Sequence, residues 1–360
     1  MLKRLYVKNF TVFAEANFEF GPGLNVVVGT NGTGKSHVLK LGYAVLRSLV
    51  SRLQQDKNAA FSMPDSPLTG LKNIFRPAPA DVTELIRRHA AIPGAVIDYE
   101  IDDERVSPVR ISISANFSGE SSFTITPASA AAEIGESVAP PVLIPAKEIL
   151  TLGWMTQASR QLKLQLDEAY LDLLLQLSGL PLQNPEPAAT AALKQLTAIL
   201  GGEIEEDNGR FYLVYPKEKR LEMNMVAEGL RKFGTLQKLL ANGSLTPKTT
   251  LFWDEPEANL NPALLRKLAA VLAELARQGF QIIMATHSLF LLNELHILTQ
   301  TQPTSVRYFG LYQAEGGDTK VEQTNDLEKL HHLVALDEEI AQTARFQRVL
   351  DNEDTHAEHN

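Results

Sequence analysis

The chain has 360 residues, of which 44% are apolar and 21% charged, a composition that is ordinary for a globular protein and argues against global disorder. The formal net charge of −9 excludes a generally basic nucleic-acid coat, so any contact with a phosphate backbone requires a local patch. The absence of cysteine excludes disulfides, thiolate zinc sites and cysteine nucleophiles. With no signal-peptide pattern and no apolar run of about 18–20 residues, we expect a soluble, cytoplasmic protein without a membrane span.

The first part of the chain predicts short strands around one long helix. Residues 2–10, 16–20 and 23–29 have the alternating and then continuous apolar character of strands. The apolar spacing from Lys35 to about Arg52 is helical. Residues 54–90 are predicted to form a loop with short helices. Antiparallel strands are predicted at 95–101, 108–115 and 121–126. A loop over 127–139 then leads to a further predicted strand near 141–146.

The second part predicts a helical insertion followed by alternating strands and helices. One helix is expected over 155–180, stopped near Gly179, and a second over 188–200, which suggests an inserted helical hairpin. Strands are then predicted at 210–215, 249–253, 280–285 and 306–312, with helices at 227–242, 262–278 and 288–299 between them. This alternation is typical of a mostly parallel, doubly wound sheet.

Residues 29–36 read GTNGTGKS and match the pattern G-x-x-x-x-G-K-[ST] in full, between the apolar run LNVVV and a predicted helix. Glycines allow the backbone to turn several N–H groups toward one point, where they and the helix start hold phosphate. We expect Lys35 to reach the β and γ oxygens of ATP and Ser36 to ligate Mg²⁺. The expected phosphate-binding residues are Gly29, Thr30, Asn31, Gly32, Thr33, Gly34, Lys35 and Ser36. The alternative is a glycine-rich turn that precedes a helix by chance.

Two adjacent carboxylates, Asp254 and Glu255, directly follow the apolar run LFW in LFWDEPEANLNP. An unpaired carboxylate is costly to remove from water, so this strand end requires a partner. Strand ends of a parallel sheet converge on the ligand crevice, which predicts that Asp254 lies beside Ser36 and holds Mg²⁺. Glu255 is then placed to accept a proton from attacking water or to orient that water. Helix capping is the alternative, but Asn261 and Pro262 begin the next helix well after the acid pair.

Together these residues resemble the ABC-type ATPase heads of the SMC, RecF and OLD-like families, often labelled AAA family ATPases. LYVKNFTVFAEANFEFGPGLNVVVGTNGTGKS looks like their opening hairpin and Walker A loop, and LFWDEPEANLNP is similar to their extended Walker B and D-loop. FQIIMATHS resembles the strand that delivers the switch histidine, which senses the γ-phosphate. The resemblance implies this role for His287, which follows Asp254 by 33 positions (287 − 254). An ordinary polar turn at Thr-His-Ser is the alternative.

The resemblance also implies a signature segment that contacts the γ-phosphate bound to the opposite subunit. The candidate is MVAEGLRKFGTL, with Ala227, Glu228 and Gly229 at a helix start, and Gly229 lies 25 positions before Asp254 (254 − 229). Ala227 stands where the family usually has a serine. An amphipathic helix with Glu228 at its favourable end is the alternative. The expected Q-loop position, IPAKEIL at 144–150, offers Lys147 and Glu148 but no glutamine.

The resemblance covers roughly residues 1–50 and 205–315. It implies an α/β P-loop NTPase with a mostly parallel doubly wound sheet, an N-terminal antiparallel β subdomain and an inserted helical hairpin. The expected units are an N-terminal lobe (1–150), a helical insertion (151–205), a C-terminal lobe with signature, Walker B and switch histidine (206–350) and a tail (351–360). The insertion lacks the sustained heptads of a long SMC arm. Too few residues follow His287 for an OLD-type nuclease, so we expect a nuclease partner to be a separate polypeptide.

The leading hypothesis is an ATPase that forms a head-to-head homodimer around ATP and Mg²⁺ and signals to DNA or an effector protein in defence or repair. Basic clusters at Arg87-Arg88-His89 and at Lys217, Lys219 and Arg220 make nucleic acid a candidate partner. Two alternatives stay open at this point. One is a P-loop kinase for a small molecule, which would need an acceptor. The other is a nucleotide-binding scaffold with little turnover.

Overall fold

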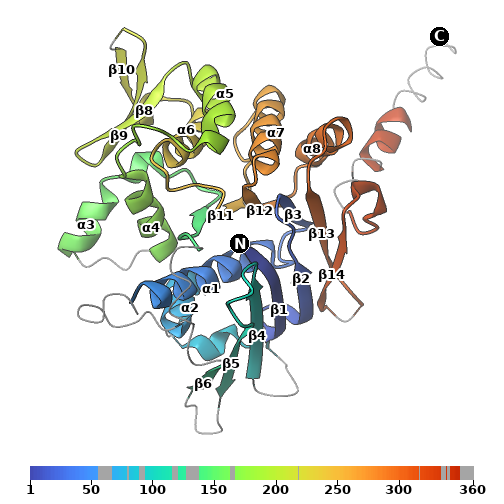
Figure 1. The fold of residues 1–360 in the computed structure, drawn as a ribbon. Coiled ribbons are helices and arrows are strands. Elements are labelled where there is room, and N and C mark those ends of the chain that lie inside the picture. The colour runs from blue at the N-terminus through green and yellow to red at the C-terminus, as the bar shows by residue number, and fades with distance from the viewer. Residues whose placement is uncertain are drawn as a thin grey trace, which may run out of the picture.

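The computed structural model describes residues 1–55, 67–78, 81–88, 94–115, 121–126, 138–162, 167–217, 219–315, 317–333, 338 and 341–348. These residues form a central sheet and two smaller ones, with helices between and over them (Figure 1).

A six-stranded sheet in the order β14-β13-β3-β12-β11-β7 lies at the centre of the fold. Its strands are β3 (Leu24–Gly29), β7 (Val142–Ile144), β11 (Thr250–Asp254), β12 (Gln281–Thr286), β13 (Val306–Gln313) and β14 (Thr319–Thr324). Every neighbouring pair is parallel except β13 with β14. Strands β3, β11 and β12 are buried on both faces, which accounts for their continuous apolar sequences. Because β3 and β11 run the same way, the loop after β3 and the acid pair after β11 leave the same edge of the sheet.

An antiparallel sheet in the order β2-β1-β4-β5-β6 forms the N-terminal subdomain. Its strands are β1 (Leu2–Phe10), β2 (Phe13–Glu19), β4 (Gly94–Ile101), β5 (Val109–Ala115) and β6 (Ser121–Thr126). Helix α1 (Lys35–Gln55) packs between this sheet and the central one. One core joins Leu39 and Val45 of α1 to Phe252 and Ile283 of the central sheet and to Ile97 of β4. Helix α2 (Pro67–Phe75) packs on α1, and the short helix η1 (Val82–Leu85) follows it.

The opposite face of the central sheet is covered by helices (Figure 1). These are α4 (Glu168–Leu177), α5 (Thr190–Leu200), α6 (Glu228–Ala241), α7 (Pro262–Arg277) and α8 (Leu289–Thr301). Trp253 and Met284 point into this second core, whereas the neighbouring Phe252 and Ile283 point toward α1. A small sheet in the order β10-β9-β8 packs beyond α6, with β8 (Glu203–Asp207), β9 (Arg210–Tyr215) and β10 (Lys219–Glu222). Because β11 is buried on both of its faces, its position is fixed, and so is the position of the acid pair at its end.

The single helix predicted over 155–180 is wrong. The chain forms α3 (Met155–Leu162) and then α4, which begins at a new N-cap. The side chain of Asp167 accepts a hydrogen bond from the backbone N–H of Ala169 at 3.0 Å, and this starts a separate helix. Strands β8, β10 and β14 were not predicted either, because their sequences are rich in charged or polar residues.

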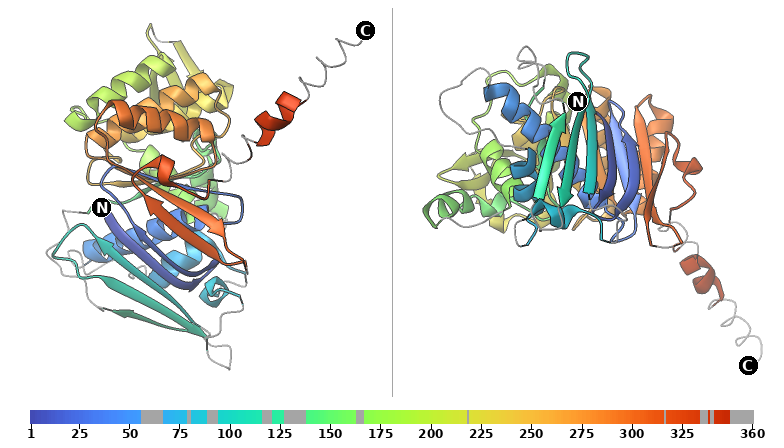
Figure 2. Two further views of the ribbon diagram at one scale, coloured as in Figure 1. Left: turned by 90° about the vertical axis from the view of Figure 1, so that its right-hand side faces the viewer. Right: turned by 90° about the horizontal axis from the view of Figure 1, so that it is seen from below.

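Residues 341–348 form a helical segment that projects away from the sheets (Figure 2). The tail expected at 351–360 lies outside the described residues. In the described part of the chain, no helix combines the length and apolar character needed to cross a bilayer.

Candidate nucleotide site

The loop between β3 and α1 has the backbone that a phosphate cradle requires. Gly29, Gly32 and Gly34 all have positive φ, at 156°, 84° and 95°. A Cβ atom on Gly34 would lie 2.6 Å from Val12 Cγ2 and 2.8 Å from Phe13 Cζ. Glycine at position 34 is therefore required both by its φ and by the close approach of the β1–β2 hairpin. The tight packing fixes the loop against the antiparallel sheet.

Two side chains brace the loop from inside. Thr33 is fully buried, and its hydroxyl donates to the carbonyl of Thr30 at 2.8 Å. The Lys35 ammonium donates to the carbonyls of Gly29 at 2.8 Å and Thr30 at 3.1 Å. Burial lowers the pKa of Lys35, and the negative charges beginning with Glu255 oppose that shift. The cation thus lies inside the loop and close to the acid pair, at the position that the sequence predicted for a phosphate contact.

The acid pair and the loop meet as expected. The Ser36 hydroxyl lies close enough to the Asp254 carboxylate to act on its pKa through hydrogen bonding. Burial raises the pKa of Asp254, the Ser36 hydrogen bond lowers it, and the Glu255 charge raises it further. Among the described residues, Asp254 Oδ1 has no hydrogen-bond partner although it is buried. An orphaned carboxylate oxygen beside a hydroxyl fits Mg²⁺, which is usually held by one or two carboxylates together with substrate phosphates and water.

Glu255 occupies a strained turn directly after β11. Its φ is +46°, a conformation that residues other than glycine rarely adopt. The turn is held by main-chain contacts, since the Glu255 N–H donates to Ala285 O at 2.9 Å and its carbonyl accepts from Lys232 Nζ at 2.8 Å. Glu255 Oε1 lies 3.8 Å from His287 Nδ1, and the His287 side chain is 55% exposed. The two side chains therefore lie side by side, and His287 lines the hollow that adjoins the phosphate loop.

Two further residues at this site were not predicted from the sequence. Glu257 is only 7% exposed, and its Oε1 accepts from the Thr286 hydroxyl at 2.7 Å and from the His287 N–H at 3.0 Å. Lys232 is only 3% exposed and donates to the carbonyls of Glu255 and Pro256. A signal existed for each, namely an acid two positions after Glu255 and a lysine on the apolar face of a predicted helix. Neither signal identifies the partner.

The signature candidate packs against the turn that follows the acid pair. Ala227 is the N-cap of α6, and its methyl side chain cannot cap the helix. Glu228 Oε1 accepts from Asn259 Nδ2 at 2.8 Å, and a Cβ atom on Gly229 would lie 2.8 Å from the Asn259 carbonyl. Within one chain, the segment is thus joined to the turn after β11. Its contact with the γ-phosphate of ATP bound to a second chain stays a prediction.

The Q-loop candidate contacts α6. Glu148 Oε2 lies 3.3 Å from Arg231 Nη1 and accepts from the Thr151 hydroxyl at 2.8 Å. The Glu148 side chain is only 6% exposed, whereas Lys147 is exposed. Glu148 therefore links the segment after β7 to the signature helix.

The two basic clusters are partly paired within the chain. Arg87 forms an ion pair with Asp318. Arg220 lies 3.6 Å from the ring centroid of Tyr212 and 2.9 Å from Asp207 Oδ2. His89 of the first cluster lies outside the described residues. These contacts reduce the positive charge that each cluster offers to a phosphate backbone.

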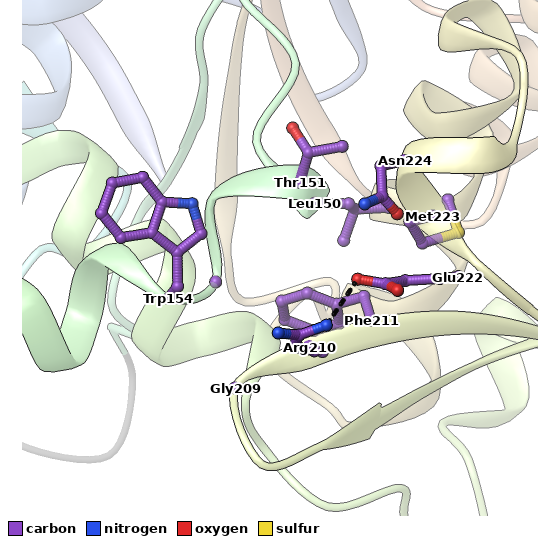
Figure 3. Close-up of a pocket in the computed structure, with 10 residues that line it drawn as sticks. Leu150, Thr151, Trp154, Gly209, Arg210, Phe211, Glu222, Met223 and Asn224 are labelled. Carbon is purple, nitrogen blue, oxygen red and sulfur yellow. Dashed lines mark hydrogen bonds and ion pairs between the residues drawn. The ribbon is translucent and has the colours of Figure 1, made fainter.

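Two hollows lie near these elements. One of about 380 Å³ adjoins the phosphate loop and is lined by Val28, Gly29, Thr30, Asn31, His287, Leu292, Leu333 and Glu338. A second, of about 240 Å³, lies between the 150–154 turn and the β9–β10 hairpin (Figure 3). Trp154 lies on one side of it, and Arg210 pairs with Glu222 at 3.3 Å on the other. The phosphate loop and the acid pair do not line this second pocket.

Comparisons with known proteins agree with this arrangement of motifs. A family model described as "AAA domain" matches residues 4–42, and one described as "AAA domain, putative AbiEii toxin, Type IV TA system" matches residues 150–293. No curated protein matches the chain significantly.

Solved structures of SMC heads share the fold. The SMC head domain from Thermotoga maritima is 14% identical, covers 90% of this chain and 98% of its own, and gives a TM-score of 0.50. An SmcHead bound to the C-winged helix domain of ScpA is 16% identical, with coverages of 91% and 98% and a TM-score of 0.54. The Smc head with an extended coiled coil, bound to the C-terminal domain of ScpA from Pyrococcus furiosus, is 14% identical, with coverages of 94% and 99% and a TM-score of 0.54.

At these identities the likeness to the SMC heads is one of fold, and the two family models fall on the segments that carry the Walker A and Walker B motifs. The resemblance and the fold class predicted from the sequence are thus confirmed. The chain thus shares the fold of the SMC head domains and carries two segments that match AAA-domain family models.

Proposed function

We propose that the chain binds ATP with Mg²⁺ between the phosphate loop and the acid pair, hydrolyses it, and uses the cycle to open and close a head-to-head homodimer. The observation that carries the proposal is that Asp254 lies beside Ser36, while the Asp254 oxygen Oδ1 is buried and unpartnered among the described residues. Folding alone gives no reason to bury a carboxylate in this state, whereas a bound cation does.

Several groups around the loop would bind ATP and Mg²⁺ together. Backbone N–H groups of residues 29–36 and the start of α1 would hold the phosphates. Lys35 would exchange its contacts with the Gly29 and Thr30 carbonyls for phosphate oxygens. Ser36 and Asp254 would hold Mg²⁺, which when bound neutralises negative charge that develops on the phosphates.

Glu255 and His287 would act on the attacking water and the γ-phosphate. Glu255 Oε1 lies 3.8 Å from His287 Nδ1, where it would accept a proton from the water or orient it. His287, more than half exposed, would donate to a γ-phosphate oxygen and report whether that group is present. The strained φ of Glu255 and the two main-chain contacts that hold it support a preorganised role.

A homodimer would complete each site with the signature segment, Ala227, Glu228 and Gly229, of the second copy. The start of α6 offers backbone N–H groups to an anion even though Ala227 replaces a hydroxyl. The effector would be a separately encoded protein, such as a nuclease in a defence or repair system. Two of the similar SMC heads are bound to domains of ScpA, which supports a protein partner. Nucleic acid is a secondary candidate, and the proposed location is the cytoplasm.

The function is tested by phosphate release from ATP and Mg²⁺ with no added acceptor. We expect equal amounts of ADP and phosphate, and loss of both products in Glu255→Gln. Glu274→Gln is a matched control, because Glu274 pairs with Arg277 on α7 and takes no part in the site. A strict requirement for an added acceptor would instead indicate a small-molecule kinase. Tight ATP binding without turnover would indicate a scaffold.

A further inference from the structure

We propose that Glu257 is a positioning residue that holds the switch histidine at its working distance from Glu255. The inference rests on the proposed ATPase function and adds a residue that neither the Walker motifs nor the switch histidine accounts for.

The geometry joins Glu257 to the end of β12 through one carboxylate oxygen. Oε1 accepts from the Thr286 hydroxyl at 2.7 Å and from the His287 N–H at 3.0 Å. The same oxygen lies 3.4 Å from His287 Nδ1, closer than the 3.8 Å between that nitrogen and Glu255 Oε1. The backbone and the ring of His287 are thus both held by Glu257.

The burial of Glu257 argues against a purely structural role. Its Oε2 is buried and has no hydrogen-bond partner within the described part of the chain. A buried carboxylate with unused acceptor capacity is costly, and a neutral glutamine would serve the Thr286 and His287 N–H contacts at lower cost. Beyond these two hydrogen bonds, the side chain that the Glu257 carboxylate reaches is the His287 ring, whose Nδ1 lies 3.4 Å from Oε1.

A buried cation compensates this charge from a different element. Lys232 lies on α6, and burial lowers its pKa; the Glu257 carboxylate is the first of the negative charges that oppose this shift. Its ammonium holds the carbonyl of Glu255 at 2.8 Å and that of Pro256 at 3.4 Å. Lys232 thus fixes the turn that carries Glu255 while Glu257 fixes His287, and together they set the separation of the two side chains.

A double-mutant cycle separates positioning from independent structural support. The four proteins are the wild type, Glu257→Gln, His287→Ala and the double variant, each measured for kcat and for ATP affinity. We expect Glu257→Gln to lower kcat by about 10- to 100-fold, by analogy with the loss of an outer-shell residue that orients a metal ligand. The ATP Kd should stay unchanged, and the double variant should be no slower than His287→Ala. If the two losses multiply, Glu257 acts independently of the histidine and the inference is overturned. Glu274→Gln is again the matched control.

Hydrogen exchange tests the same contact without turnover. In the nucleotide-free protein, Glu257→Ala should accelerate amide exchange in a peptide covering residues 284–289 and leave a peptide from α1 unchanged. Glu257→Gln, which keeps an acceptor for the His287 N–H, should preserve protection. Unchanged exchange in Glu257→Ala would overturn the inference whatever the activity. If the wild type released no phosphate, the proposed function would fail, and the exchange result would still decide whether Glu257 holds the histidine.

Discussion

At the scale of single residues, Asp254 is a site residue that lowers the stability of the nucleotide-free fold. Its carboxylate is partly buried beside a second acid, and the buried oxygen Oδ1 has no partner in the described part of the chain. Burial is the largest cause of its raised pKa, so the fold disfavours the charged form. Such a group is common where a protein awaits a ligand.

The raised pKa gives a stability prediction with a definite sign. Asp254→Asn should stabilise the nucleotide-free protein at pH 7 by on the order of 1 kcal/mol, because it removes a disfavoured buried charge. The penalty exists only where the unfolded chain is ionised, above a pKa of about 3.9, so the gain should shrink as the pH falls toward 4. Urea unfolding of both proteins at several pH values measures this.

With Mg²⁺ and ATP added, the wild type should become more stable than Asp254→Asn. The wild type should gain thermal stability because the ligand binds only the folded state, and Asp254→Asn should gain little. A variant that is less stable than the wild type without nucleotide would instead mean that the carboxylate is a structural partner.

Lys35 provides a second test at this scale. Lys35→Ala removes a charge-assisted hydrogen bond to phosphate, typically about 1.5–3 kcal/mol, so ATP affinity should fall by roughly 10- to 100-fold or more. Isothermal titration measures the affinity. Lys40→Ala is the matched control, because Lys40 lies on the same helix and pairs with Asp167 at 3.4 Å. Equal affinities for Lys35→Ala and the wild type would contradict the placement of the phosphates.

At the scale of elements, the predictable parts of the fold are those with a simple pattern. The strands β3, β11 and β12 are continuous apolar runs, and the loop and acid pair that follow β3 and β11 were correctly expected at one sheet edge. Strand β8, with the sequence EIEED, was missed because it is paired in a small sheet whose outer face is charged. A charged strand and a polar loop look alike in sequence.

The contacts of the site could not be predicted for a different reason. Lys232 reaches the carbonyl of Pro256, and Glu257 reaches the backbone of His287, through side chains that join distant segments. Sequence spacing places a residue on a helix face or at a strand end, and it does not determine which buried group lies opposite. The N-cap at Asp167, in contrast, is a local signal that the sequence does contain. It was missed because the apolar spacing favoured one long helix.

A polar link between α1 and α4 gives a prediction about elements. Asp172 Oδ2 accepts from the Tyr43 hydroxyl at 2.7 Å and from Arg47 Nε at 2.6 Å. Because Tyr43 is almost fully buried, Asp172→Ala should cost about 1–3 kcal/mol by leaving its hydroxyl unpaired. Urea unfolding checks this.

The control for that link is an exposed pair on the antiparallel sheet. Asp98 contacts Arg110 at 2.7 Å, but the Arg110 side chain is 62% exposed. Asp98→Ala should therefore destabilise the protein much less than Asp172→Ala does. If the two variants lost similar amounts of unfolding free energy, the α1–α4 link would be no more stabilising than an exposed ion pair.

At the scale of the whole molecule, the proposed dimer would use two parts of the chain as half-sites. The phosphate loop and the acid pair would form one, and the start of α6 would form the other. Glu228 and Gly229 lie against Asn259 in the turn after the acid pair, so the two parts are packed together within one chain. This arrangement suits a dimer in which each nucleotide is contacted by both copies.

Glu255→Gln should trap that dimer. The amide keeps the size and the turn geometry of the side chain but cannot accept a proton from water, so ATP binds and is not consumed. Size-exclusion chromatography with light scattering should give a dimer with ATP and Mg²⁺ and a monomer without nucleotide. The same variant carrying Lys35→Ala should stay monomeric, because its cradle lacks the cation that holds the phosphates. A trapped variant that binds ATP yet elutes only as a monomer would remove the dimer from the proposed cycle and leave ATP binding intact, since affinity and association are measured separately.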